Sequence, residues 1–156
     1  MKKNKTRLNL KHAEIKDIKF THQLFNQNIL EKNFFSRKKV NLRNHEIWFK
    51  KRIKQKKFYI GWLRKRVGYI RFDEINKKNL SVSIAIDKKY KRKGYGKKML
   101  LKTLNNEEIS KFNVLAKIRQ DNLTSKKFFL NSGFKFFKDN FYIFKSKKKE
   151  DKNIKK

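Results

Sequence analysis

The chain has 156 residues, a formal net charge of +33, and neither cysteine nor proline. This length suits a single domain, and the absence of cysteine excludes disulfides, thiolate metal sites and a cysteine nucleophile. No apolar stretch approaches the roughly 18 residues of a membrane span, and the N-terminus does not resemble a signal peptide. We therefore expect a cytoplasmic protein that does not associate with membranes.

The positive charge raises the hypothesis of a basic nucleic-acid-binding module, and we expect non-specific polyanion binding at low salt. However, the lysines are spread over the whole sequence, and Asn, Ile and Phe are abundant as well. This composition is typical of an AT-rich coding sequence. No zinc-ligand spacing or RNP-type aromatic motif supports nucleic-acid recognition. The three histidines are too scattered in the sequence to indicate a metal site, so we expect none.

The first half of the chain is predicted to contain a short strand, two helices and two further strands, in that order. Leu8 and Leu10 alternate with polar residues, which predicts that first strand. Apolar residues at helical spacing predict a helix over residues 14–28, and Asn44 is the predicted N-cap of a second helix. Residues 58–63 and 66–72 are predicted to form two strands joined by a basic turn.

The second half contains the clearest strand. Residues 80–86 alternate between large apolar side chains and the small Ser81, Ser83 and Ala85, which is typical of a strand. A helix after Gly94, a strand over 114–118, a helix over 122–132 that ends at Gly133, and two short strands over 134–137 and 141–144 follow. We therefore predict one mixed α/β domain over residues 1–147 and a disordered basic tail over residues 148–156.

A basic loop with two glycines, Gly94 and Gly96, lies between the strand that ends at Ile86 and the next helix. A helix N-terminus presents unpaired backbone N–H groups and a partial positive charge, which favour a phosphate ligand. Glycine lets the backbone approach such a ligand closely. The third glycine of the dinucleotide-binding fingerprint and the Gly-Lys-Ser/Thr of a P-loop are missing. The loop therefore predicts another type of phosphate or pyrophosphate site.

The segment Lys91-Arg-Lys-Gly94-Tyr-Gly96 resembles the acetyl-CoA loop of the GNAT N-acetyltransferase superfamily, Gln/Arg-x-x-Gly-x-Gly/Ala, except for Lys in its first position. Residues 121–134 are similar to the Asn-x-x-Ala/Ser…Gly-Phe segment of the same family. The resemblance implies a twisted, mostly antiparallel sheet of about seven strands, splayed between the fourth and fifth strands and flanked by about four helices. It also implies acetyl-CoA as the co-substrate, bound by Ile84, Ala85, Ile86, Lys91, Arg92, Lys93, Gly94, Tyr95, Gly96, Lys97, Asn122, Ser125 and Phe129.

A narrower resemblance concerns the acceptor. The segments His45-Glu-Ile-Trp-Phe49 and Gly68-Tyr-Ile-Arg-Phe-Asp73 are similar to the nucleotide-sugar branch of the family, the UDP-4-amino-4,6-dideoxy-sugar N-acetyltransferases of pseudaminic acid synthesis. Where those relatives carry Trp-Arg-Asn, this chain has residues 26–28, Asn-Gln-Asn. The resemblance implies that the acceptor contacts His45, Trp48, Phe49, Arg71 and Asp73.

The same residues also have purely structural interpretations. His45, Trp48 and Phe49 could be core residues of a helix, and Arg71 could pair with a carboxylate. Asp73 and its neighbour could belong to a solvated turn. The sequence alone leaves these alternatives open.

The expected reaction is direct acetyl transfer to a primary amine. Glu74 and His45 are the hypothesised general bases. Many relatives place a Tyr general acid at the position of Phe129, so Tyr142 or Tyr95 becomes the candidate acid. Alternatively, the thiolate leaves without an acid, because its pKa is near 8.5.

Three functional hypotheses follow. The first is acetylation of the 4-amino group of a nucleotide-linked sugar, by a monomer or homodimer. The second is acetylation of a protein, at its N-terminus or on a ribosomal protein, by the same fold. The third is the nucleic-acid-binding module, which predicts binding that is lost with salt and no specific acetyl-CoA site.

Overall fold

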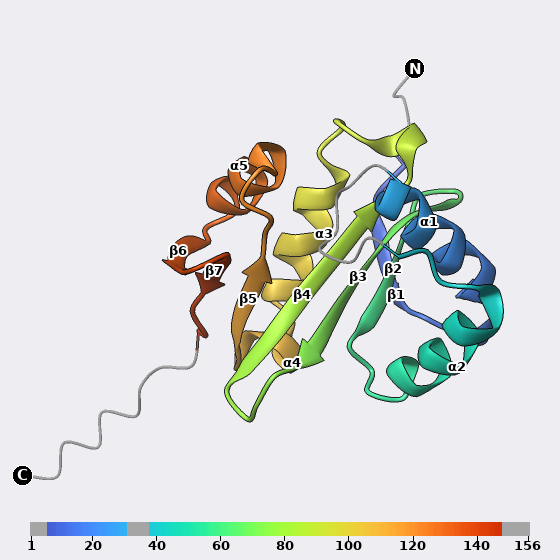
Figure 1. The fold of residues 1–156 in the computed structure, drawn as a ribbon, viewed down its shortest axis with the longest axis horizontal. Helices are drawn as coiled ribbons and strands as arrows, with labels where there is room; N and C mark the ends of the chain where they lie inside the picture. Colours follow the sequence, from blue (N-terminus) through green and yellow to red (C-terminus); the bar gives the residue numbers. More distant parts are fainter. Residues whose placement is uncertain (1–5, 31–37, 148–156) are drawn as a thin grey trace, which may run out of the picture.

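The computed structural model describes residues 6–30 and 38–147, and the expected disordered tail lies outside these ranges. The helices and strands alternate along the chain (Figure 1) as β1 (Asn9–His12), the 3-10 turn η1 (Ile15–Asp17), α1 (Ile18–Leu30), α2 (Leu42–Ile53), β2 (Phe58–Trp62), β3 (Arg66–Glu74), β4 (Asn79–Ile86), the 3-10 turn η2 (Lys88–Tyr90), α3 (Tyr95–Leu104), α4 (Glu107–Ser110), β5 (Asn113–Lys117), α5 (Leu123–Asn131), β6 (Lys135–Lys138) and β7 (Phe141–Phe144).

The strands form one seven-stranded sheet in the order β1-β2-β3-β4-β5-β7-β6. Every neighbouring pair is antiparallel except β4 and β5. The parallel pair is short, because only Asn79–Ser81 of β4 are in register with Asn113–Leu115 of β5. Beyond this point the two strands diverge (Figure 1). The mixed α/β fold and the splay between the fourth and fifth strands are therefore confirmed.

Helices cover both faces of the sheet. On one face α1 contacts β3 and β4, and α2 packs against α1; on the other face α3 contacts the same two strands. Each interface has its own buried cluster, which supplies most of the hydrophobic stabilisation. The cluster under α1 and α2 consists of Ala13, Ile18, Leu24, Phe49, Phe58, Ile60, Tyr69 and Ala85. The larger cluster under α3, α4 and α5 includes Phe72, Leu80, Met99, Leu100, Leu104, Ile109, Val114, Phe129 and Phe134.

The structure corrects the predicted start of the second helix. Asn41, not Asn44, is the N-cap of α2, because its side chain accepts a hydrogen bond from the backbone N–H of Asn44. Two Asn residues three positions apart offer the same capping chemistry, so the sequence pattern cannot choose between them. The short helix α4 was not predicted either; Asn106 caps it by accepting from the N–H of Glu108.

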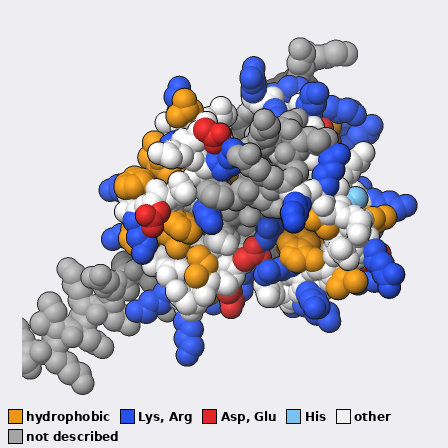
Figure 2. Space-filling view, in the orientation of Figure 1, with side chains coloured by type: hydrophobic (Ala, Val, Ile, Leu, Met, Phe, Trp, Pro, Cys, Tyr) orange, Lys and Arg blue, Asp and Glu red, His pale blue; other side chains and the backbone are white. Residues whose placement is uncertain are grey.

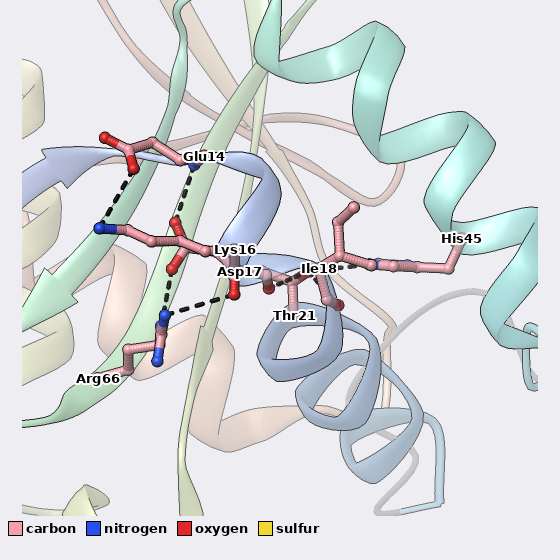
Figure 3. A network of polar contacts seen from close by, with 7 residues as sticks. All are labelled: Glu14, Lys16, Asp17, Ile18, Thr21, His45 and Arg66. Atoms are coloured by element: carbon pink, nitrogen blue, oxygen red, sulfur yellow. Dashed lines mark hydrogen bonds and ion pairs between the residues drawn. The ribbon is translucent and has the colours of Figure 1, made fainter.

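A buried carboxylate ties the start of α1 to the sheet (Figure 3). Asp17 is 2% exposed and accepts hydrogen bonds from Nε of Arg66 at 2.7 Å and from the backbone N–H of Glu14 at 2.8 Å. Arg66 also donates to the backbone oxygen of Lys16. One side chain thus links the β1–α1 connection to the first residue of β3.

We expect Asp17→Asn to lower the free energy of unfolding by about 2 kcal/mol, because it replaces a charge-assisted pair with a weaker hydrogen bond at a buried site. Urea denaturation measures this change. Lys16→Ala is the matched control: it removes an exposed ion pair with Glu14 and should change stability by about 0.5 kcal/mol or less. Equal losses in the two variants would show that the Asp17 pair does not hold this connection.

Candidate active site

The divergence of β4 from β5 leaves one edge of β4 open. Residues 82–86 have paired neighbours on β3 but none on β5 among the described residues. An unpaired strand edge presents backbone N–H and C=O groups that can bind an extended polar ligand. Ile84, Ala85 and Ile86, which were predicted to bind the cofactor, lie on this open edge.

The helix α3 begins beside that edge. Gly94 is its N-cap and has φ 81°, in the left-handed region, and the backbone N–H of Lys98 is the first to bond back to it. The N–H groups of residues 95–97 are therefore not used within the helix and remain available to an anion. A Cβ placed on Gly94 would meet no atom within 4 Å, so the space next to this turn is open.

The loop before α3 adds positive charge to this end of the helix. Lys91, Arg92 and Lys93 all precede Gly94, and Arg92 also has a left-handed φ of 61°. The side chains of Arg92, Lys93 and Lys97 are exposed. Together with the helix dipole, they make this loop an electropositive site for a phosphate group.

The second glycine has a different role from the first. A Cβ on Gly96 would lie 3.4 Å from Phe128 of α5 and 3.5 Å from Ile86 of β4, which is ordinary van der Waals contact. Gly96 therefore lies close to α5 and to the end of β4, at distances that would also admit a Cβ. The three elements that carry the predicted cofactor residues therefore lie side by side at the end of β4.

Two predicted cofactor residues, Asn122 and Phe129, make contacts within the protein at α5. Asn122 caps α5 by accepting from the N–H of Ser125 at 3.1 Å. Phe129 is 6% exposed and packs against Phe128 and Phe134 in the larger core cluster. Phe129 is therefore a core residue, and the contacts of its side chain are packing contacts.

The open edge of β4, the free N–H groups of α3 and the basic loop fit acetyl-CoA. The loop and the helix N-terminus would hold its diphosphate, and the backbone edge of residues 82–86 would hydrogen-bond its pantetheine amides. Bound there, acetyl-CoA supplies the acetyl group as a thioester.

The face of the sheet under α2 carries a charged cluster one strand away from the open edge of β4. Arg71 of β3 is paired in register with Ser83 of β4 and forms a close ion pair with Asp73. The guanidinium carbon of Arg71 lies 4.8 Å from the centre of the Trp48 ring. Arg52 binds the other oxygen of Asp73 at 3.0 Å. Three of the predicted acceptor residues are therefore brought together, with Arg52 as an unpredicted fourth.

His45 lies in the interior between α1 and α2. It is 3% exposed, its Nε2 lies 2.9 Å from the hydroxyl of Thr21 (Figure 3), and its ring packs on those of His22, Trp48 and Phe49. Burial, with the nearby His22 and Arg71 as smaller causes, lowers the pKa of His45 to about 4. A buried, weakly basic imidazole that already has a partner does not suit a general base, so we assign His45 to helix packing.

Two further catalytic candidates, Glu74 and Tyr142, lie on the far side of the sheet. Glu74 is paired in register with Leu80, a residue of the larger core cluster, and its carboxylate is 3.3 Å from Lys57. Tyr142 is 8% exposed within the same cluster and packs against Phe136. Since side chains alternate along a strand, Glu74 and Arg71 point to opposite faces. The structure thus does not bring Glu74, His45 and Tyr142 into one catalytic group.

Tyr69 and Arg52 were missed by the sequence analysis. Tyr69 lies two residues before Arg71 on the same face of β3, and burial raises its pKa to about 12, so its hydroxyl stays protonated. Arg52 follows Trp48 by four residues, which places both on one side of α2. That spacing was the available signal for Arg52.

The chain belongs to the GNAT acetyltransferase family, because the model of the acetyltransferase (GNAT) domain matches residues 7–135. This confirms the predicted family and makes the chain an acetyl-CoA-dependent N-acetyltransferase. No curated protein sequence matches the chain.

Several solved structures share the fold. The yncA protein of Salmonella typhimurium, solved with its cofactor acetyl-CoA, has a TM-score of 0.72 and 16% identity over 88% of this chain and 90% of that one. Spermidine N-acetyltransferase of Vibrio cholerae, in complex with CoA and spermine, has a TM-score of 0.72 and 17% identity over 87% of this chain and 91% of that one. Ribosomal-protein-alanine N-acetyltransferase of Brucella melitensis has a TM-score of 0.71 and 16% identity over 86% of this chain and 95% of that one. At these identities the likeness concerns the fold alone.

Two further findings concern residues 6–30 and 38–147. None of the helices there combines the length and the apolar character needed to cross a membrane. Within the same ranges, no three His, Asp or Glu side chains lie close enough together to hold a metal ion.

Proposed function

We propose that this enzyme acetylates the primary amine of a nucleotide-linked amino sugar, at its 4-amino group. The observation that supports this acceptor is the charge beside the open edge of β4. Arg71 and Arg52 outnumber the single carboxylate of Asp73, and Figure 2 shows many more Lys and Arg than Asp and Glu side chains on the visible face. Such a surface attracts an anionic acceptor and repels a polycation.

An anionic acceptor separates this proposal from its alternatives. A nucleotide-linked sugar carries a diphosphate, whereas a polyamine carries only positive charge. A protein N-terminus presents a single amine with no fixed anion beside it. The cationic cluster therefore favours the nucleotide sugar over both, although all three acceptors offer the same reacting amine.

The residues of this chain mainly bind and orient the two reactants. Backbone N–H groups on the open edge of β4 can donate hydrogen bonds to an oxygen on which negative charge develops, which stabilises the transition state. Ser81 and Ser83 are small and half-buried on the acceptor face of β4, so they leave room for the amine. A sugar amine has a lower pKa than lysine, so water suffices to take its proton.

The test is an acceptor screen with acetyl-CoA at about 0.3 M salt, read by mass spectrometry. The acceptors are a UDP-4-amino-4,6-dideoxy-sugar, spermidine, and a peptide with a free N-terminus. We expect the sugar nucleotide to be acetylated with the highest kcat/KM. Faster acetylation of the peptide would favour the protein acetyltransferase, and faster acetylation of spermidine would contradict an anionic acceptor.

A further inference from the structure

We propose that Arg71 and Arg52 form an anion-binding site that holds a phosphate group of the acceptor while its amine reaches the open edge of β4. This inference rests on the proposed function and adds to it the residues that recognise the acceptor and the chemical group that they bind. Asp73 and Trp48 complete the site as the groups that orient the two guanidiniums.

The two arginines converge on one carboxylate from different elements. Arg71 comes from β3 and binds one oxygen of Asp73, and Arg52 comes from α2 and binds the other at 3.0 Å. The Trp48 ring lies against both guanidiniums, 4.8 Å from that of Arg71 and 5.9 Å from that of Arg52. Stacking on an aromatic ring leaves the edge of a planar guanidinium free to donate hydrogen bonds.

The cluster has more positive charge than its carboxylate neutralises. Two guanidiniums share a single carboxylate, and the side chains of Arg71 and Asp73 are only 16% and 18% exposed. Burial lowers the pKa of Arg71, and the like charge of Arg52 lowers it further as a smaller cause. A partly buried net positive charge is best stabilised by an anion with several acceptor oxygens.

One donor of the cluster has no partner. Nε of Arg71 is buried and makes no hydrogen bond within the described part of the chain. Buried donors in native proteins are nearly always paired, because an unmade bond at a buried site is costly. Arg71 therefore has unused hydrogen-bonding capacity, and the fork geometry of a guanidinium suits a phosphate oxygen in a way that an ammonium cannot reproduce.

The site lies at the right place for an acceptor. Arg71 is in register with Ser83, so it lies one strand away from the open edge of β4, about 4.8 Å in the direction of the hydrogen bonds. Arg71 contacts Trp48 of α2, so it points to the α2 face, away from the larger cluster under α3. A phosphate bound here is therefore separate from the diphosphate of acetyl-CoA at the start of α3.

The experiment measures UDP binding by calorimetry to enzyme saturated with CoA, at about 0.3 M salt. Saturation with CoA occupies the site at α3, and uridine serves as the probe that lacks phosphate. We compare the wild type with Arg71→Gln, Arg71→Lys and Arg64→Gln. Arg64 is an exposed residue of the β2–β3 turn. Its variant therefore also removes one positive charge, but at a position outside the cluster.

We expect UDP to bind ~10- to 100-fold more weakly to Arg71→Gln, because one charged hydrogen-bonding group is lost. Arg71→Lys should recover only part of the affinity, Arg64→Gln should stay within about twofold of the wild type, and CoA affinity should be unchanged in all three. Uridine should bind weakly to every protein. Equal UDP affinities for Arg71→Gln and Arg64→Gln would overturn the site, and circular dichroism checks that each variant is folded.

The outcomes also separate this inference from the proposed function. If UDP binding depends on Arg71 but the amino sugar nucleotide is not acetylated, the anion site stands and the sugar acceptor is wrong. If the sugar nucleotide is acetylated with the same KM by the wild type and Arg71→Gln, the acceptor stands and the anion site is overturned.

Discussion

Gly94→Val is expected to weaken acetyl-CoA binding by about 100-fold or more. Gly94 has φ 81°, which a β-branched residue resists strongly, so the turn must change to relieve the strain. That change moves the free N–H groups at the start of α3 away from the phosphate. The valine side chain also enters the open space beside the turn, where no protein atom lies within 4 Å of its Cβ.

Calorimetric titration with acetyl-CoA measures this effect, and Gly133→Ala is the control for backbone strain. Gly133 also has a positive φ of 95°, but it lies after α5, and its Cβ would approach Phe144 at 3.1 Å. The control should lose thermal stability and keep its affinity for acetyl-CoA. If Gly94→Val and Gly133→Ala lose affinity equally, the turn at Gly94 does not bind the cofactor.

The free energy of unfolding should fall by about 3 kcal/mol between pH 7 and pH 4 because of His45 alone. The folded protein holds the pKa of this histidine at about 4, against an ordinary value of 6.5. As the pH falls below 6.5, His45 becomes protonated in the unfolded chain but stays neutral in the folded protein. The contribution of His45 to the free energy of unfolding is therefore fully present above pH 6.5 and is lost as the pH falls to 4.

Urea denaturation at pH 7 and pH 4 tests this expectation, with His45→Gln as the comparison. Glutamine keeps a polar group that can reach Thr21 but does not titrate in this range. The variant should be less stable at pH 7, since it loses ring packing between α1 and α2, and its stability should change less with pH. Parallel pH profiles for the two proteins would show that His45 is not the buried neutral group.

The fold could be predicted largely because its signals are local. Alternation over residues 80–86 defines β4, and glycine after α5 takes the positive φ that ends a helix. The start of α2 could not be fixed, since Asn41 and Asn44 offer equal caps and only the folded backbone selects one. The short α4 has too few residues to show helical periodicity.

The site was predictable in its cofactor half and less so in its catalytic half. The Gly94 loop is contiguous in sequence, so its chemistry can be inferred from spacing. The face of β3 on which Glu74 lies, and the depth at which His45 is buried, depend on strand pairing and helix packing far along the chain. Arg52 likewise joins the charged cluster around Arg71 through its tertiary contact with Asp73.

The most direct test of the account is a thermal-shift titration of the wild-type protein with acetyl-CoA at about 0.3 M salt. ADP and a polyphosphate are the controls, because a chain of net charge +33 binds anions without selectivity. At ~100 times its Kd, a specific ligand adds roughly 2.7 kcal/mol of stability. We expect this stabilisation with acetyl-CoA and little with polyphosphate. Equal shifts with both would contradict an acetyl-CoA site between β4 and α3 and would favour the nucleic-acid-binding module.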